Sequence, residues 1–119
     1  MSKIKIYHNP KCSNSRNALA LIRAQGHDPE VILYLEKMPS RDELQIIIEN
    51  SGELVRALIR SKESIYTELG LDRQDLSNAL LIEAMLAHPV LMNRPIVVTP
   101  LGTRLCRPPE RVLEILPQA

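Results

Sequence analysis

The residue best suited to chemistry in this chain is Cys12, in the stretch HNPKCSNSRNAL. A strand-like run, KIKIYH, leads into this stretch, and a helix-like run follows it. The thiol is therefore expected at a helix N-terminus, where free backbone N–H groups and the helix dipole favour an anion. The thiolate is the reactive form of cysteine, and this environment lowers a thiol pKa. The same N–H groups can hold an oxyanion.

Polar neighbours could tune this thiol. His8 ends the strand-like run, and a protonated imidazole there would stabilise a thiolate. The hydroxyls of Ser13 and Ser15 could donate hydrogen bonds to the sulfur. Two plainer interpretations stay open: Cys12 as a small buried hydrophobe, and His8 as a surface histidine. The polar flanks favour function for Cys12, because α/β folds place ligands at the carboxyl ends of strands.

The spacing around Cys12 argues against two familiar motifs. A dithiol motif needs a second cysteine three residues on, where this chain has Ser15. A low-molecular-weight phosphatase loop needs arginine six residues after the cysteine, where this chain has Ala18. Arg16 comes too early for that role. Cys12 is therefore predicted to act without a neighbouring resolving thiol.

Composition narrows the function class. The length of 119 residues favours one domain, 1–119. A formal charge of +1 gives no electrostatic case for nucleic acid or membrane binding. The chain has neither a signal-peptide pattern nor an apolar run long enough to span a bilayer, and its two distant cysteines favour a reducing cytoplasm. Ten of the fifteen basic residues are arginine, which is either a compositional habit or a sign of a bound oxyanion.

The elements that would position Cys12 follow from local patterns. Ile4 and Ile6 alternate as in a strand, Gly26 ends the following helix, and Ser40 with Glu43 forms a capping box. A continuous apolar run, VILYL, is typical of a buried strand parallel to the first. The predicted elements are a strand at 3–8, a helix at 13–25, a strand at 31–35, helices at 41–50, 54–60, 65–69 and 77–87, a hairpin at 95–107 that turns at 101–103 and returns at 104–107, and a last helix that starts at 108–110.

This order predicts the fold class. A β-α-β unit, a helical block at about 40–88 and a β-β-α unit form a thioredoxin/glutaredoxin-like α/β layout with a four-stranded mixed sheet. In such folds a proline at the start of the third strand is commonly cis and lies beside the active cysteine. Pro95, after Arg94, occupies that place.

Several dispersed segments together resemble one family. YHNPKCSNSRNAL, VILYLE, PSRDEL, VRALIR, ELGL, HPVLMNRPIVVTPLGTRLCRPPE and VLEIL are similar, nearly end to end, to the ArsC family of glutathione- and glutaredoxin-dependent arsenate reductases. The resemblance implies that Cys12 is the nucleophile and that His8 and Ser15 assist it. It also implies that three arginines bind the oxyanion: Arg60, Arg94 and Arg107. After the cysteine this chain has Ser13-Asn14, where the plasmid-type members have Gly-Thr.

The implied reaction needs external thiols. The Cys12 thiolate attacks arsenate, glutathione attacks the adduct, glutaredoxin completes the reduction, and arsenite leaves. Neither a metal nor a tightly bound cofactor is expected. Two other functions stay open: a regulator of the Spx type that binds RNA polymerase, and a monothiol oxidoreductase that removes glutathione from proteins. The missing C-x-x-C argues against the first and the arginine trio against the second.

The second cysteine, Cys106, needs a separate interpretation. On a strand its side chain points opposite to that of Arg107. If Arg107 faces the site, Cys106 faces away and is a packed structural thiol. A role for Cys106 in resolving Cys12 is the alternative.

Overall fold

The computed structural model describes residues 3–117, which group into two compact units. The first, called the sheet unit here, comprises residues 3–37 and 94–117, and the second, the helical unit, comprises residues 38–93. The chain leaves the sheet unit after its second strand and returns to it at the third. The expectation of a single domain over the whole chain stays a prediction.

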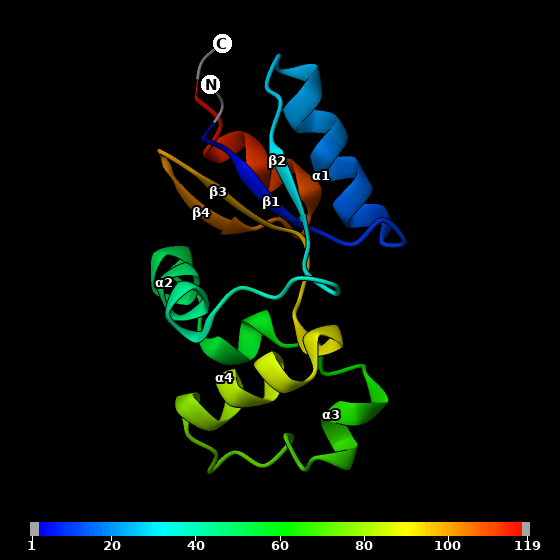
Figure 1. The fold of residues 1–119 in the computed structure, drawn as a ribbon, viewed down its shortest axis with the longest axis vertical. Coiled ribbons are helices and arrows are strands. Elements are labelled where there is room, and N and C mark those ends of the chain that lie inside the picture. Colours follow the sequence, from blue (N-terminus) through cyan, green and yellow to red (C-terminus); the bar gives the residue numbers. More distant parts are fainter. Residues whose placement is uncertain (1–2, 118–119) are drawn as a thin grey trace. The chain divides into compact units, whose positions relative to one another are not determined.

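A four-stranded mixed sheet forms the centre of the sheet unit, as predicted (Figure 1). The strand order is β2-β1-β3-β4. β1 pairs parallel with β2 and antiparallel with β3, and β3 pairs antiparallel with β4. The strands are β1 (Lys5–His8), β2 (Glu30–Leu33), β3 (Ile96–Thr99) and β4 (Gly102–Leu105).

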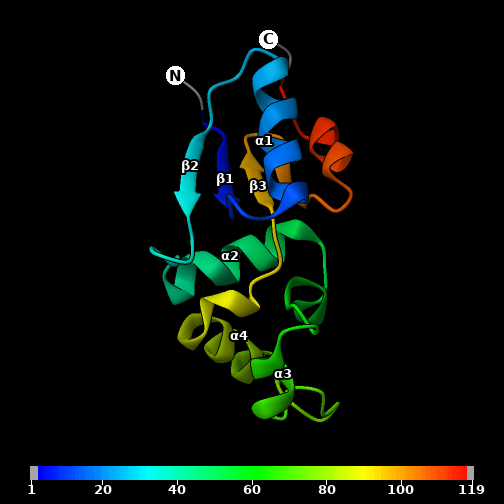
Figure 2. The same ribbon diagram turned by 90° about the vertical axis from the view of Figure 1, so that its right-hand side faces the viewer.

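The core of the sheet unit lies under two helical segments, α1 (Ser13–Ala24) and η3 (Pro109–Glu114), which pack against each other (Figures 1 and 2). α1 has the apolar stripe expected of a helix that covers a sheet, and the chain turns after it at Gly26, whose φ is 87°. The buried cluster consists of Ile4, Ile6, Ala18, Ile22, Val97, Cys106, Val112 and Ile115. The strand alternation of Ile4 and Ile6 had placed the first two of these side chains on one face.

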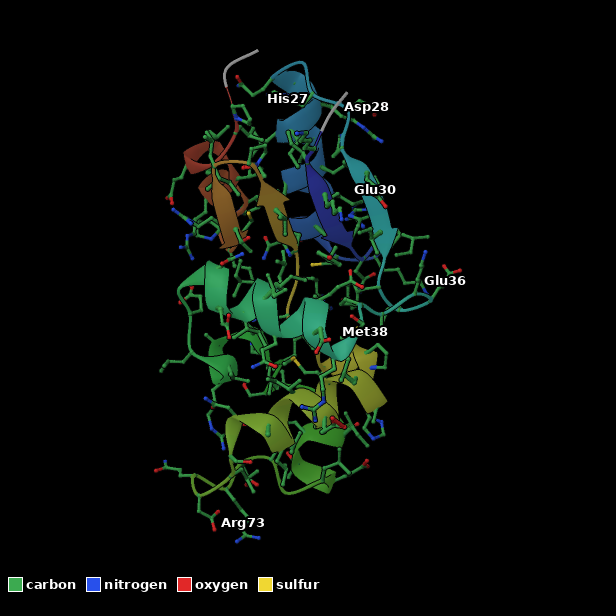
Figure 3. The ribbon with its side chains drawn as sticks, turned by 60° about the vertical axis from the view of Figure 1, so that its left-hand side comes forward. His27, Asp28, Glu30, Glu36, Met38 and Arg73 are labelled. Carbon is green, nitrogen blue, oxygen red and sulfur yellow. The ribbon has the colours of Figure 1, made fainter. Side chains whose placement is uncertain are left out.

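The prediction that the second strand is buried was wrong. β2 is an edge strand, and Leu33 and Leu35 are 37% and 47% exposed. The labelled Glu30 and Glu36 mark the two ends of this segment in Figure 3. A continuous apolar run cannot by itself distinguish a central strand from an edge strand. Only Tyr34, just after the strand, is fully buried in this run.

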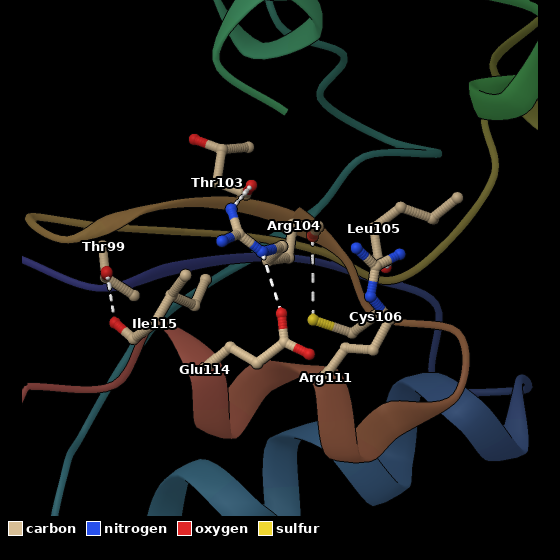
Figure 4. A network of polar contacts seen from close by, with 8 residues as sticks. All are labelled: Thr99, Thr103, Arg104, Leu105, Cys106, Arg111, Glu114 and Ile115. Carbon is tan, nitrogen blue, oxygen red and sulfur yellow. Dashed lines mark hydrogen bonds and ion pairs between the residues drawn. The ribbon is translucent and has the colours of Figure 1, made fainter. Parts of the chain in front are cut away.

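The hairpin turns earlier than predicted. β4 begins at Gly102, opposite Thr99, and ends at Leu105 instead of running from 104 to 107. The Thr99 hydroxyl accepts the Leu101 N–H at 3.0 Å and donates to the carbonyl of Ile115 at 2.5 Å (Figure 4). This hydroxyl therefore stabilises the tight turn and ties it to the chain that follows η3. The last predicted helix is a 3-10 helix.

The helical unit confirms the predicted helical block. Ser40 accepts the Glu43 N–H and Ser77 accepts the Leu80 N–H, each at 3.2 Å, so both long helices start at capping serines. α2 is followed by Gly52, whose φ is 72°. The elements are α2 (Arg41–Ser51), η1 (Val55–Leu58), α3 (Ser64–Glu68), α4 (Asn78–Ala87) and η2 (Pro89–Leu91). The predicted helix at 54–60 is thus a short 3-10 turn.

Arg56 ties the less regular part of the helical unit together. Its Nη1 donates to the Tyr66 hydroxyl at 2.9 Å and to the Leu71 carbonyl at 2.6 Å, and its Nη2 donates to the Arg73 carbonyl. α3 has no buried residue of its own. The bonds of Arg56 therefore help to hold α3 and the residues that follow it in place. Within residues 3–117, no helix is both long and apolar enough to cross a membrane.

Candidate active site

A tight turn between β1 and α1 presents Cys12. The Cys12 N–H donates to the Asn9 carbonyl at 3.0 Å, which closes the turn. The Cys12 carbonyl accepts the Arg16 N–H at 3.0 Å, the first bond of the helix. Cys12 is thus the N-cap residue of α1, with extended backbone angles. The predicted placement of the thiol at a helix N-terminus is confirmed.

The surroundings of the Cys12 sulfur favour the thiolate. Partial burial raises the pKa of Cys12, but hydrogen bonds from the Ser15 N–H, the Arg94 side chain and the Asn14 N–H lower it, and so does the positive charge of Arg94. The net effect is a pKa below the ordinary value for a thiol. The side chain is half-buried rather than enclosed. A lowered pKa and a half-buried side chain are two properties that favour a nucleophilic cysteine.

Ser15 acts differently from the prediction. Its Oγ lies 2.7 Å from His8 Nδ1 and accepts the Asn9 N–H at 3.0 Å. The hydroxyl is thus engaged with the strand end and the turn, and it is the backbone N–H of Ser15 that reaches the Cys12 sulfur. Ser15 is fully buried, which makes this network a fixed part of the turn.

His8 is not the surface histidine of the plainer interpretation, because it is only 6% exposed. Burial lowers its pKa, and the nearby positive charges of Arg23 and Arg16 lower it further. Both effects favour the neutral imidazole and work against the protonated form considered from the sequence. Its connection to the sulfur runs through Ser15. The predicted tuning role of His8 stays a prediction, with a hydrogen bond in place of a charge.

Two of the three predicted arginines are linked to each other in the sheet unit. Arg94 contacts the Cys12 sulfur, and Arg107 Nη1 donates to the Arg94 carbonyl at 3.0 Å. Both arginines precede a cis-proline, Pro95 and Pro108. The isomer of the Arg94–Pro95 bond, which the sequence left open, is cis. The Arg94 guanidinium is placed to meet an anion that approaches Cys12.

The third predicted arginine, Arg60, belongs to the helical unit. Its Nε donates to Glu63 Oε2 at 3.1 Å, with the two side chains 19% and 27% exposed. Its backbone is held as well, because the Arg60 N–H donates to the Leu91 carbonyl at 2.7 Å. The implied role of Arg60 in binding an oxyanion stays a prediction.

Cys106 lies in the core of the sheet unit, fully buried, whereas Arg107 is exposed. Its Sγ donates to the Arg104 carbonyl at 3.7 Å (Figure 4). Burial raises the pKa of Cys106 to about 12, although Arg111 and Arg104 lower it. Cys106 is thus packed as the structural thiol that the sequence favoured, although both residues follow the end of β4 at Leu105 and do not alternate on the strand. Such a thiol is unreactive at neutral pH.

Sequence reasoning missed the part played by Asn9. An Asn-Pro pair is typical of a turn, but nothing in the sequence shows that Asn9 bonds to three neighbours. The Asn14 N–H at the sulfur belongs to the first turn of α1, whose free N–H groups were expected to favour an anion. No group of three or more His, Cys, Asp or Glu side chains within residues 3–117 is arranged to hold a metal ion.

Comparison with known proteins gives a consistent result. The model of the ArsC family matches residues 7–115. An arsenate reductase of Acidiphilium multivorum is 59% identical over 119 residues, which are all of this chain and 84% of that protein. The structure of an arsenate reductase from Vibrio cholerae has a TM-score of 0.91 and 52% identity, covering 95% of this chain and 97% of that one. A putative arsenate reductase from Yersinia pestis has a TM-score of 0.88 and 48% identity, covering 95% and 100%.

Proposed function

The chain belongs to the ArsC family, and we propose that it reduces arsenate to arsenite with Cys12 as the nucleophile. One observation carries the proposal: the Cys12 sulfur receives the Ser15 N–H, the Asn14 N–H and the Arg94 side chain. These donors stabilise a thiolate before substrate binds. An arsenate oxyanion that meets the sulfur also meets the Arg94 guanidinium, which can neutralise the charge that builds up on its oxygens.

The first step joins sulfur to arsenic. The Cys12 thiolate forms an S–As bond, one As–O bond breaks, and the departing oxygen is protonated and leaves as water. Arg94 binds the arsenate oxygens that remain. We assign the same role to Arg107, which is held against the Arg94 backbone, and to Arg60, as the family resemblance implies.

The next steps reduce the arsenic. A glutathione thiolate displaces a second oxygen as water, so arsenic is bound by two sulfurs. A glutaredoxin thiolate then attacks the glutathione sulfur, forming a disulfide. The S–As bond to glutathione breaks, its electron pair stays on arsenic, and arsenic(V) becomes arsenic(III). Water cleaves the remaining bond to Cys12, and arsenite leaves while the thiolate is restored.

External thiols are proposed because the described chain offers no suitable second thiol. Ser15 stands where a dithiol motif would have its partner cysteine, and Cys106 is buried with a raised pKa. Both cysteines are free, which fits a reducing compartment, and we propose the cytoplasm.

The test is arsenate-dependent NADPH oxidation in an assay coupled through glutathione, glutathione reductase and glutaredoxin. We expect turnover with the wild type and its loss in Cys12→Ser, with an unchanged circular dichroism spectrum. Cys106→Ser is the matched control and should keep its turnover. Activity on a glutathionylated peptide with no arsenate reduction would favour the monothiol oxidoreductase. Capture of RNA polymerase with neither activity would favour the regulator.

A further inference from the structure

We propose that Asn9 is a positioning residue whose hydrogen bonds aim the Cys12 sulfur at the N–H groups of the first turn of α1. The inference rests on the proposed function in one respect, that Cys12 is the nucleophile. It goes beyond that function because it gives a role to a residue that neither touches the sulfur nor carries a charge. Asn9 is almost fully buried, 9% exposed, although it lies in a turn.

Asn9 bonds to three different parts of the turn. Its side-chain Oδ1 accepts the Lys11 N–H at 3.0 Å, an Asx turn. Its carbonyl accepts the Cys12 N–H at 3.0 Å. Its own N–H donates to Ser15 Oγ at 3.0 Å. Pro10, which follows Asn9, has no N–H. The two N–H groups that remain in the turn, those of Lys11 and Cys12, both donate to Asn9.

These three bonds connect the sulfur to its donors. The carbonyl bond fixes the backbone of Cys12, and the bond to Ser15 fixes the first turn of α1, which supplies two of the N–H groups at the sulfur. The side-chain bond is the one that only certain residues can make, because the other two come from the backbone. It holds the Lys11 peptide in the orientation that the closed turn requires.

Loss of the Oδ1 acceptor should therefore act on the thiol at a distance. The Lys11 N–H loses its partner, the turn opens, and Cys12 shifts against the Ser15 and Asn14 N–H groups. Hydrogen bonds weaken steeply as their geometry degrades. A weaker set of donors leaves the thiolate less stabilised, so the thiol pKa rises and less nucleophile is present at neutral pH.

A serine at this position gives the matched rescue. Its hydroxyl can accept the same N–H two residues on, more weakly than asparagine does, and it adds no charge. Asn9→Ala and Asn9→Ser thus differ only in whether an acceptor is present. Asn17→Ala is the control for loss of an asparagine, because Asn17 is exposed on α1.

The experiment measures the rate at which iodoacetamide alkylates Cys12 across a pH series, with the modified cysteine identified by mass spectrometry. We expect Asn9→Ala to raise the thiol pKa by about one unit, roughly tenfold less thiolate below the pKa. Asn9→Ser should recover part of the shift, and Asn17→Ala should match the wild type. The arsenate kcat should fall with the thiolate fraction, with KM changed less.

A Cys12 pKa in Asn9→Ala equal to that of the wild type would overturn the proposal, even if the variant unfolds at a lower temperature. Equal pKa values for Asn9→Ala and Asn9→Ser, both shifted, would overturn it too, because the acceptor would then not matter. Absence of arsenate turnover in the wild type would refute the proposed function alone. The alkylation data would still decide the role of Asn9.

Discussion

The two units hold their arginines in opposite ways. In the sheet unit, the Arg94 side chain donates to the Cys12 sulfur, and Arg107 is anchored to the Arg94 carbonyl. In the helical unit, Arg60 donates to a carboxylate three residues away, Glu63. One guanidinium is thus directed at a nucleophile, whereas the other has its charge balanced by a neighbour. The family resemblance implies the same role for these arginines, and the structure gives them different partners.

The units also differ in how their loops are fixed. The turn before α1 is held by short hydrogen bonds among buried groups, His8, Asn9 and Ser15. α3 itself has no buried residue, and the segment that follows it is held by buried Leu71 and by the partly buried side chain of Arg56. A network of buried bonds resists local opening better than one anchor does. The sheet unit can therefore hold a reactive group precisely oriented, and the helical unit is expected to open more easily.

The largest effect is expected from Arg94→Lys. Lysine keeps the charge but loses the planar fork that can bond the sulfur and an oxyanion together. We expect kcat/KM for arsenate to fall roughly 10- to 100-fold, the equivalent of about 1.5–3 kcal/mol for a hydrogen bond to a charged group. The control is Arg104→Lys, whose arginine pairs with Glu114. Equal activity in the two variants would contradict the role of Arg94 at the Cys12 sulfur.

Arg56→Ala tests the second half of the comparison. The variant loses bonds to the Tyr66 hydroxyl and to two carbonyls, and we expect the free energy of unfolding to fall by roughly 2 kcal/mol. Amide hydrogen exchange should speed up first at Ser64–Glu68 and not at Lys5–His8. Urea unfolding measures the decrease in the free energy of unfolding of the whole chain.

The control for Arg56 is Arg41→Ala, which breaks an exposed ion pair with Glu83. It should cost less than about 1 kcal/mol, because exposed pairs contribute little. If Arg56→Ala left exchange unchanged in α3, the anchoring role of Arg56 would be refuted.

Local patterns were sufficient to predict much of the fold. The capping box at Ser40 and the alternation of Ile4 and Ile6 are signals within a few residues, and each element they predicted is present. The parallel pairing of the first two strands followed from the helix between them. The edge position of β2 could not be predicted, because it depends on where β3 inserts, far along the chain.

In the candidate site, too, the features set by neighbouring residues could be predicted, whereas those set by distant residues could not. The position of Cys12 at a helix N-terminus is local, so the sequence predicted it. The charge of His8 is not local: it depends on burial and on Arg16 and Arg23, which the turns of α1 bring near the imidazole. Residue types suggested a cation beside the thiol, whereas packing produces a neutral ring bonded to Ser15.

His8→Gln and His8→Ala test that neutral role. Glutamine has no titrating charge but can still bond the Ser15 hydroxyl, whereas alanine cannot. We expect His8→Gln to keep more of the Cys12 alkylation rate at neutral pH than His8→Ala does, with a difference of several fold, about 1 kcal/mol for one hydrogen bond. If both variants lost the same fraction of the Cys12 alkylation rate, the result would favour a protonated His8 that stabilises the thiolate by its charge.

The pH dependence of stability gives a second measure of His8. Its folded-state pKa lies below the ordinary value of 6.5, so the unfolded chain binds the proton more readily. Stability is therefore full above 6.5, falls as the pH drops through 6.5, and stops falling below the folded-state pKa. Denaturant unfolding at a series of pH values should show a shallower fall in His8→Gln. Parallel curves for the variant and the wild type would contradict the lowered pKa.

The smallest effect is expected from Glu63→Gln in the helical unit. The carboxylate offsets the charge of Arg60, and its loss leaves a stronger cation for an oxyanion. We expect the KM for arsenate to fall by only a few fold, because a partly exposed pair is worth at most about 1 kcal/mol. Glu114→Gln, which frees Arg104 instead, is the matched control and should leave KM unchanged. If Glu63→Gln also leaves KM unchanged, Arg60 takes no part in binding arsenate, and the arginines that serve the site are those of the sheet unit.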